Sequence, residues 1–115
     1  MIQVIGTKKC KATQKALRFF RERSIVVQFL DVSVRALAPA ELDNCARALG
    51  GVSALLDKAG IRWRERGMEH LECDQREELL ADMDLLLTPV IRQGKTACIG
   101  NDEAAWKAMA AGEKA

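Results

Sequence analysis

The first thirty-one residues constrain the fold most strongly, because two apolar runs flank an amphipathic segment. Residues 2–5 form a short apolar run that predicts a buried strand ending at Gly6. Residues 11–20 have the periodicity of a helix with one apolar face. Residues 25–30 are β-branched and mostly apolar, which predicts a second buried strand. This order predicts a βαβ unit with parallel strands and a right-handed crossover.

Cys10 lies where the first strand is expected to turn into the first helix. The first N–H groups of a helix lack internal partners and carry about half a positive charge, so they stabilise a thiolate. Lys8, Lys9 and Lys11 add positive charge, and Thr13 can direct its hydroxyl toward the sulfur. Such surroundings lower a thiol pKa from about 8.5 to roughly 3.5–7.5. The sequence therefore predicts a nucleophilic Cys10. The alternative is a structural cysteine buried at a strand end.

Length and charge narrow the classes of function. A chain of 115 residues has the size of one domain. Its net charge is +2 with the basic residues spread along the chain, so nothing requires a nucleic-acid partner. No apolar run approaches the ~18 residues that span a bilayer, and the chain begins with a predicted strand rather than a signal peptide. We expect a cytoplasmic protein with no direct nucleic-acid partner and no membrane partner.

The other three cysteines carry weaker signals. None of the four cysteines forms a C-x-x-C pair, so free thiols in a reducing compartment are expected. Cys45 falls on the apolar face of a predicted helix and is interpreted as core. Cys73 is interpreted as incidental, with a resolving thiol as the alternative. His70 and Cys73 form an isolated pair, whereas a zinc site usually needs four ligands with paired spacings, so no metal is expected.

The middle of the chain reads as helical. A helix is expected to open at Pro39, whose fixed φ suits a first helical turn. Residues 61–66 contain three arginines and allow two interpretations that remain open. The segment is either a solvated loop or extended edge whose Trp63 inserts into the core, or it folds one arginine over the thiol to bind an anion. Residues 72–87 are predicted as one helix with Asp74 as its N-cap.

The C-terminal part reads as a hairpin followed by a helix. Two short apolar runs, 90–91 and 97–99, flank the turn residues 93–95. Pro89 heads the first of these strands and is a candidate for a cis peptide bond. Residues 101–102 are expected to cap the last helix.

The predicted order is β-α-β, a helical middle, then β-β-α, which is typical of the thioredoxin fold. The chain resembles the arsenate reductase (ArsC)/Spx family, a thioredoxin-like group with a helical insertion. The resemblance covers nearly the whole chain. It is carried by Cys10 at the first strand–helix turn, Ala59 to Arg64, Leu87 to Ile91, and Ile99 to Asn101.

This resemblance implies an α/β, thioredoxin-like (glutaredoxin-like) fold in a single domain spanning 1–115. Residues 1–34 and 86–112 would form the thioredoxin-like core, and residues 35–85 the α-helical insertion. The tail 112–115 is expected to fray.

The resemblance also implies roles for individual residues. Cys10 would be the nucleophile, Arg64 would face the anion or the thiolate, and a cis Pro89 would shape the floor of the site. Thr13 matches a serine or threonine of single-cysteine members. Glutathione or glutaredoxin would be the reductant, with glutathione a co-substrate and no cofactor tightly bound.

Departures from the family pattern argue against efficient arsenate reduction. Thr88 stands where an arginine normally precedes the proline, and Ile99 or Gly100 occupies the region of a second arsenate-binding arginine. Arg92 could partly replace these, although strand alternation can turn it away.

Two hypotheses follow from these residues. The first is a glutathione-linked thiol reductase acting on a small oxidised or anionic substrate through Cys10, Thr13 and Arg64. Its candidate substrate-binding residues are Lys8, Lys9, Lys11, Thr88, Pro89 and Arg92. The alternative is a Spx-like regulator that docks on RNA polymerase. The segment from Cys10 to Thr13 lacks the second cysteine of a Spx-type switch.

Overall fold

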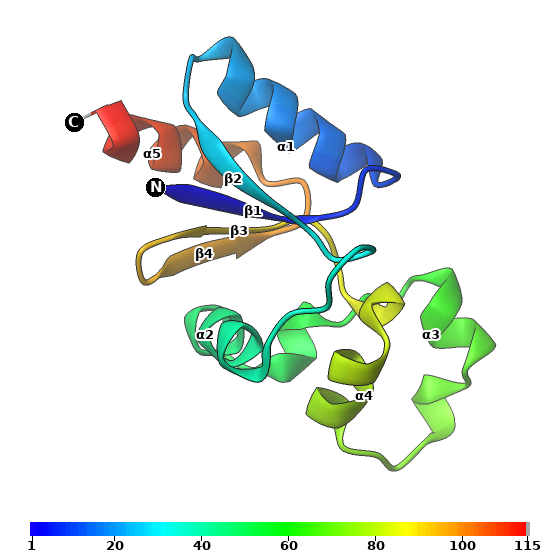
Figure 1. The fold of residues 1–115 in the computed structure, drawn as a ribbon. Helices are drawn as coiled ribbons and strands as arrows, with labels where there is room; N and C mark the ends of the chain where they lie inside the picture. The colour runs from blue at the N-terminus through cyan, green and yellow to red at the C-terminus, as the bar shows by residue number, and fades with distance from the viewer. Residues whose placement is uncertain (115) are drawn as a thin grey trace.

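The computed structural model describes residues 1–114 as a four-stranded mixed sheet with helices on both faces (Figure 1). Its strands, in the spatial order β2-β1-β3-β4, are β1 (Ile2–Gly6), β2 (Val27–Asp31), β3 (Val90–Gln93) and β4 (Thr96–Ile99). β1 pairs parallel with β2 and antiparallel with β3, which pairs antiparallel with β4. The predicted βαβ unit and the predicted hairpin are both confirmed.

The helices form two groups around this sheet. The longer ones are α1 (Lys11–Glu22), α2 (Pro39–Leu49) and α5 (Glu103–Lys114); shorter pieces are η1 (Val52–Leu55), α3 (Ile61–Glu65), η2 (Met68–His70), α4 (Gln75–Ala81) and η3 (Met83–Leu85). α1 and α5 lie on one face of the sheet, and α2 with the shorter pieces lies on the other (Figure 1). Within residues 1–114, the helices are too short or too polar for any of them to cross a bilayer.

Strand alternation divides the buried residues into two clusters, one on each face of the sheet. On one face, Val4 of β1 packs with Phe20 of α1 and Trp106 of α5. On the other, Ile5 packs with Leu42 of α2 and with the apolar residues of the insertion. Because β1 is covered on both faces, its sequence is a nearly continuous apolar run.

The segment predicted as one helix over 72–87 is broken. α4 begins at Gln75 after the predicted N-cap Asp74, whose carboxylate accepts two N–H groups of the first turn at 3.0 and 3.3 Å. Asp82 ends it with φ −145° and ψ 91°. The Asp82 carboxylate then accepts the N–H of Asp84 at 3.2 Å and caps η3. The single-helix prediction is wrong because this aspartate supplies the backbone with a competing hydrogen bond.

The arginine-rich segment is a short helix, so the prediction of a loop or extended edge is wrong. α3 follows Gly60, and the Arg66 N–H donates to the Arg62 carbonyl at 3.1 Å. Trp63 is partly buried and packs against the core of the α2 face, as that interpretation expected. An ion pair holds the helix to η3, with Arg62 Nη2 2.7 Å from Asp84 Oδ2.

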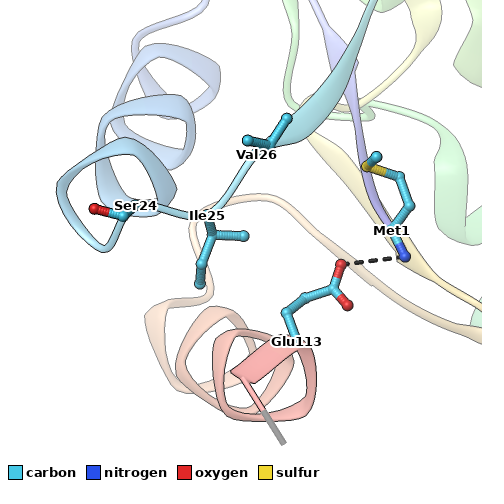
Figure 2. Close-up of a pocket in the computed structure, with 5 residues that line it drawn as sticks. All are labelled: Met1, Ser24, Ile25, Val26 and Glu113. Carbon is cyan, nitrogen blue, oxygen red and sulfur yellow. Dashed lines mark ion pairs between the residues drawn. The ribbon is translucent and has the colours of Figure 1, made fainter.

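The last helix is longer than expected. Residues 112–114 belong to α5 instead of fraying, and Ala115 lies outside the described residues. Glu113 near its end pairs with the Met1 ammonium at 3.2 Å, as Figure 2 shows. Gln93 Nε2 donates to the Met109 carbonyl at 2.8 Å, so the end of β3 is also tied to this helix.

Candidate functional site

Cys10 is the N-cap residue of α1, as its place in the sequence predicts. A tight turn leads into it from β1, in which the Cys10 N–H donates to the Thr7 carbonyl at 3.2 Å. The Cys10 carbonyl accepts the N–H of Gln14 at 3.0 Å and begins the helix. The side chain is partly buried and belongs to a free thiol. The sulfur therefore lies beside the unpaired N–H groups of the first helical turn.

The pKa of the Cys10 thiol is lowered from its ordinary value. Partial burial is the largest single influence and acts to raise the pKa, but hydrogen bonds to the thiolate outweigh it. The donors that favour the thiolate are, in order, the hydroxyls of Thr13 and Thr88 and the backbone N–H groups of Thr13 and Ala12. The helix amides and Thr13 are thus among the groups that lower the Cys10 pKa, and the catalytic role of Cys10 and Thr13 stays a prediction.

The lysines around Cys10 contribute less than the sequence suggested. Lys8, Lys9 and Lys11 are exposed, and their charges are not among the causes that lower the Cys10 pKa. Lys8 acts instead on Asp31, whose pKa is lowered mainly by hydrogen bonds from Ser33 and only in small part by the lysine. The thiolate thus depends on neutral hydrogen-bond donors, and substrate binding by the lysines stays a prediction.

Thr13 is fully buried, and its Oγ1 has no hydrogen-bond partner of its own within residues 1–114. A hydroxyl buried without a partner costs about 1–3 kcal/mol. The thiolate form of Cys10 supplies the missing acceptor. Gly6 leaves room for this arrangement, since a Cβ on that residue would lie 2.4 Å from Thr13 Oγ1. Because Gly6 has no side chain, Thr13 can pack against the end of β1 at a position close to the sulfur.

The start of β3 closes the site from the other side. The Thr88–Pro89 peptide bond is cis, in agreement with the sequence expectation for Pro89. The Cys10 thiol donates to the Thr88 carbonyl over 3.6 Å, and the Thr88 hydroxyl donates to the thiolate form. Two segments far apart in the sequence therefore meet around the sulfur: the start of α1 and the residues before β3.

Arg92 is not turned toward the sulfur. It lies opposite Gln3 in the β1–β3 register, whereas Val90 pairs with Ile5 nearer the Cys10 end. Its guanidinium lies 3.5 Å from Gln3 Oε1, and its charge acts on Glu41 and Cys45 of α2. The prediction that Arg92 contributes to the Cys10 site is therefore corrected: strand alternation directs the side chain to the α2 face.

Arg64 differs from the arginines on either side of it. Arg62 pairs with Asp84, and Arg66 pairs with Asp82 at 3.3 Å. Arg64 is exposed, and its guanidinium makes no ion pair in the part of the chain that the structure describes. α3 lies toward the same end of the sheet as the β1–α1 turn (Figure 1). Arg64 is therefore free to bind an anion, and its role beside Cys10 stays a prediction.

The remaining thiols lack the surroundings of Cys10. Cys45 and Cys98 are buried, and burial raises the pKa of both thiols, that of Cys98 to about 11. The interpretation of Cys45 as a core residue is confirmed. Cys73 is exposed in the segment before α4. Among residues 1–114, His, Cys, Asp and Glu side chains form no group of three or more that could hold a metal ion.

A hollow of about 360 Å³ at the other end of β1 is a weaker candidate for a reactive site. It is lined by Met1, Ser24, Ile25, Val26 and Glu113 (Figure 2). None of these residues is a thiol or a histidine, so the hollow offers Ser24 no imidazole base. The Met1 ammonium and the Glu113 carboxylate already neutralise each other there. The chemistry available to this chain is concentrated at Cys10.

Comparison with solved structures places the whole chain in one fold. The YffB protein superposes with a TM-score of 0.83 at 22% identity over 95% of this chain and 98% of that chain. An arsenate reductase from Vibrio cholerae gives a TM-score of 0.81 at 14% identity over 94% and 96%. An arsenate reductase (ArsC) related protein from Brucella melitensis gives 0.70 at 22% over 93% and 92%. No family model and no curated protein matches the chain.

These likenesses establish the fold. The chain has the thioredoxin-like fold of the arsenate reductases, with a helical insertion. The fold predicted from the resemblance to the ArsC/Spx family is thereby confirmed. At identities of 13–22%, what the chain does has to be argued from its own residues.

Two contributions to the thiol's surroundings go beyond the sequence analysis. The sequence predicts Thr88 as a substrate-binding residue in the place of a family arginine, whereas its carbonyl accepts from the Cys10 thiol and its hydroxyl lowers the Cys10 pKa. Gly6 was read only as the end of a strand, although its lack of a side chain makes room for Thr13. The position of Thr88, directly before the expected cis proline, is the sequence signal that could have indicated its contact with the sulfur. No sequence pattern predicts the role of Gly6, because that role depends on the packing between β1 and α1.

Proposed function

We propose that this chain is a cytoplasmic thiol-dependent oxidoreductase of the arsenate reductase-like family, with the Cys10 thiolate as nucleophile. The observation that carries the proposal is the set of donors around a partly accessible sulfur: two hydroxyls and two helix N–H groups that lower the Cys10 pKa. Thiolates are the reactive form of cysteine, and reactive cysteines lie at such partly exposed helix N-termini. The free thiols fit a reducing compartment.

The reaction that fits this site is thiol–disulfide exchange with glutathione. The Cys10 thiolate attacks one sulfur of a glutathione mixed disulfide, forms a Cys10–glutathione disulfide and expels the substrate thiolate. A second glutathione thiolate, or a glutaredoxin thiolate, attacks the glutathione sulfur and releases Cys10 as a thiolate. Two electrons pass from the reducing thiols to the substrate. The donors of Thr13 and Thr88 stabilise the thiolate that enters the first step and leaves the second.

Arg64 is the proposed partner for an anionic group of the substrate or of glutathione. Arginine matches a carboxylate with two parallel hydrogen bonds, and this guanidinium is unpaired within residues 1–114. In this proposal glutathione is a co-substrate, and no tightly bound cofactor takes part. Lys8, Lys9 and Lys11 would add long-range attraction for anions near the turn.

The first prediction is that Cys10 reacts with iodoacetamide at pH 7 faster than the other three cysteines. Its thiolate is stabilised, whereas burial protects Cys45 and Cys98. Mass spectrometry of the native chain after short labelling measures the rates residue by residue. Labelling in urea is the control, because all four thiols should then react alike. Equal native rates for Cys10 and exposed Cys73 would contradict the proposal.

Turnover provides the second half of the test. With a glutathionylated peptide as substrate, Cys10→Ser should abolish turnover and remove the glutathione adduct seen by mass spectrometry. Cys73→Ser is the matched control, and it should keep both. Loss of activity in Cys73→Ser instead would make that residue the nucleophile. Undiminished turnover in Cys10→Ser would leave a docking role, such as the Spx-like alternative, to be tested by partner binding.

A further inference from the structure

A second hollow lies on the α2 face of the sheet, away from Cys10. It has a volume of about 360 Å³ and is lined by Asn44, Arg47, Ala48, Arg92, Gly94 and Lys95. These residues come from the second half of α2, from β3 and from the β3–β4 turn. That turn lies at the opposite end of β3 from Pro89, as the strand register requires and as Figure 1 shows. Neither Cys10 nor Thr88 contributes to its lining.

Three cationic side chains gather around this hollow without a carboxylate partner. Arg47, Arg92 and Lys95 make no ion pair within residues 1–114. Arg47 Nη1 donates to Asn44 Oδ1 at 3.2 Å, which fixes the guanidinium with a neutral group. Four other arginines, Arg35, Arg62, Arg66 and Arg76, each pair with a carboxylate. The hollow therefore joins two arginines and a lysine from separate elements of the chain, and none of the three pairs with a carboxylate within residues 1–114.

Nearby acidic residues of α2 are already engaged. Glu41 feels the charge of Arg92, but both of its oxygens are held by Arg35 at 3.0 and 3.2 Å. Glu41 also accepts the Ala38 N–H at 2.8 Å. Asp43 is bound by Arg76 at 2.8 and 3.1 Å. Glu41 and Asp43 also feel the charges of Arg92 and Arg47, but their hydrogen bonds go to Arg35 and Arg76, so the donors of the hollow stay open to an external anion.

The donors suit phosphate better than a single carboxylate. Two guanidinium groups present paired N–H donors that match phosphate oxygens, and a lysine ammonium adds a point charge. Three positive charges are balanced by the two to three negative charges of a phosphate or diphosphate, whereas one carboxylate leaves most of them unbalanced. The volume lies at the lower end of the range for small-molecule sites.

We propose that the hollow between α2 and the β3–β4 turn is a binding site for a phosphate- or diphosphate-bearing small molecule. Arg47, Arg92 and Lys95 bind the phosphate oxygens, and the Asn44 amide holds Arg47 in place. The site is separate from the Cys10 chemistry, because it lies on the other side of the sheet from α1 and at the other end of β3. The proposal for this hollow and the proposal for Cys10 can therefore be tested, and contradicted, independently of each other.

The test is titration of the 15N-labelled full chain with inorganic pyrophosphate and, in parallel, with adenosine diphosphate. Saturable amide shifts are expected at Arg47, Ala48, Gly94 and Lys95. The double variant Arg47→Gln/Lys95→Gln should weaken binding about tenfold or more, because it removes two charged donors.

A charge-matched control separates a built site from general attraction between opposite charges. Arg21→Gln/Lys107→Gln removes the same net charge from exposed positions outside the hollow, and it should leave the affinity unchanged. Cys10→Ser should also bind pyrophosphate with the wild-type affinity.

The two ligands distinguish the possible occupants of the site. Binding of adenosine diphosphate as tight as that of pyrophosphate, or tighter, assigns the site to a nucleotide, and binding of pyrophosphate alone assigns it to free phosphates. Equal weakening by both double variants, shifts centred on the β1–α1 turn, or no saturation below ~10 mM would each overturn the proposal.

Discussion

At the scale of single residues, the reactive sulfur is stabilised by groups that carry no net charge. The hydroxyls of Thr13 and Thr88 and the first N–H groups of α1 lower the Cys10 pKa and together outweigh the opposite effect of burial. Screening by salt weakens exposed charge pairs but has little effect on such partly buried contacts. A site of this kind keeps its thiolate across a range of ionic strengths, which a site based on three exposed lysines would not.

We predict that Thr13→Val raises the Cys10 pKa. The donor that most lowers the pKa is removed, so the thiolate loses a hydrogen bond of the charge-assisted kind and the pKa rises toward its ordinary value. The rate of iodoacetamide labelling against pH should therefore move to higher pH. The same substitution should not lower the free energy of unfolding at a pH where Cys10 is protonated, since Oγ1 has no partner there.

Thr13→Ser is the matched control for this measurement. It keeps the hydroxyl, so its labelling profile should stay close to that of the wild type. Repeating the profiles at low and high salt tests the neutral-donor account directly, because the wild-type midpoint should barely move. A midpoint that rises with salt, or that is the same in Thr13→Val and wild type, would contradict stabilisation by neutral donors. It would indicate that the charges of the lysines stabilise the thiolate.

At the scale of elements, the site depends on how closely α1 approaches the end of β1. Gly6 and Thr13 are the contact between them, and a side chain on Gly6 would overlap Thr13 Oγ1 at 2.4 Å and Cγ2 at 2.8 Å. The position of the helix relative to the strand therefore fixes the direction of the Thr13 hydroxyl. In this way the packing of one strand against one helix is linked to the acidity of the thiol.

We predict that Gly6→Ala both destabilises the chain and raises the Cys10 pKa. Overpacking of this kind costs typically about 1–3 kcal/mol, and it pushes Thr13 from its place beside the sulfur. The double variant Gly6→Ala/Thr13→Ala should recover much of the stability because the clashing atoms are gone, while the pKa stays high. Urea unfolding and the labelling profile measure the two effects. Additive losses of stability in the double variant would contradict the contact as described.

The predictability of the elements follows the strength of their local signals. β1, α1 and β2 were predicted because their apolar residues repeat with a clear period, and α2 because Pro39 marks its start. The prediction of one helix over 72–87 is wrong because apolar residues continue through the segment, whereas Asp82 ends the helix and caps η3. The contacts of that aspartate with Arg62 and Arg66 are made in the fold and leave no mark in the local sequence.

At the scale of the whole molecule, the sheet separates two chemically different ends. Cys10, Thr13 and Thr88 lie where β1 ends and β3 begins, and the cations of the second hollow lie toward the opposite end of β3. The positions of Cys10, Thr13 and Pro89 could be predicted because a strand–helix turn and a proline-headed strand are local signals, while their roles in a reaction stay predictions. It misplaced Arg92 because only the pairing of Gln3 with Arg92 shows which face of the sheet that arginine occupies.

This arrangement leads to the last prediction, which concerns arsenate. An oxyanion bound at Cys10 would meet the Thr88 hydroxyl where the family pattern has an arginine, and Arg92 is directed to α2 instead. Each missing charge-assisted hydrogen bond costs about 1.5–3 kcal/mol, or roughly 10- to 100-fold in binding. We therefore expect weak or absent arsenate reduction in a glutathione-coupled assay. Thr88→Arg should increase it, whereas Thr88→Gln, which adds length without charge, should not. Robust turnover by the unmodified chain, or an equal gain in both variants, would show that the oxyanion is held by groups other than those assigned to the site.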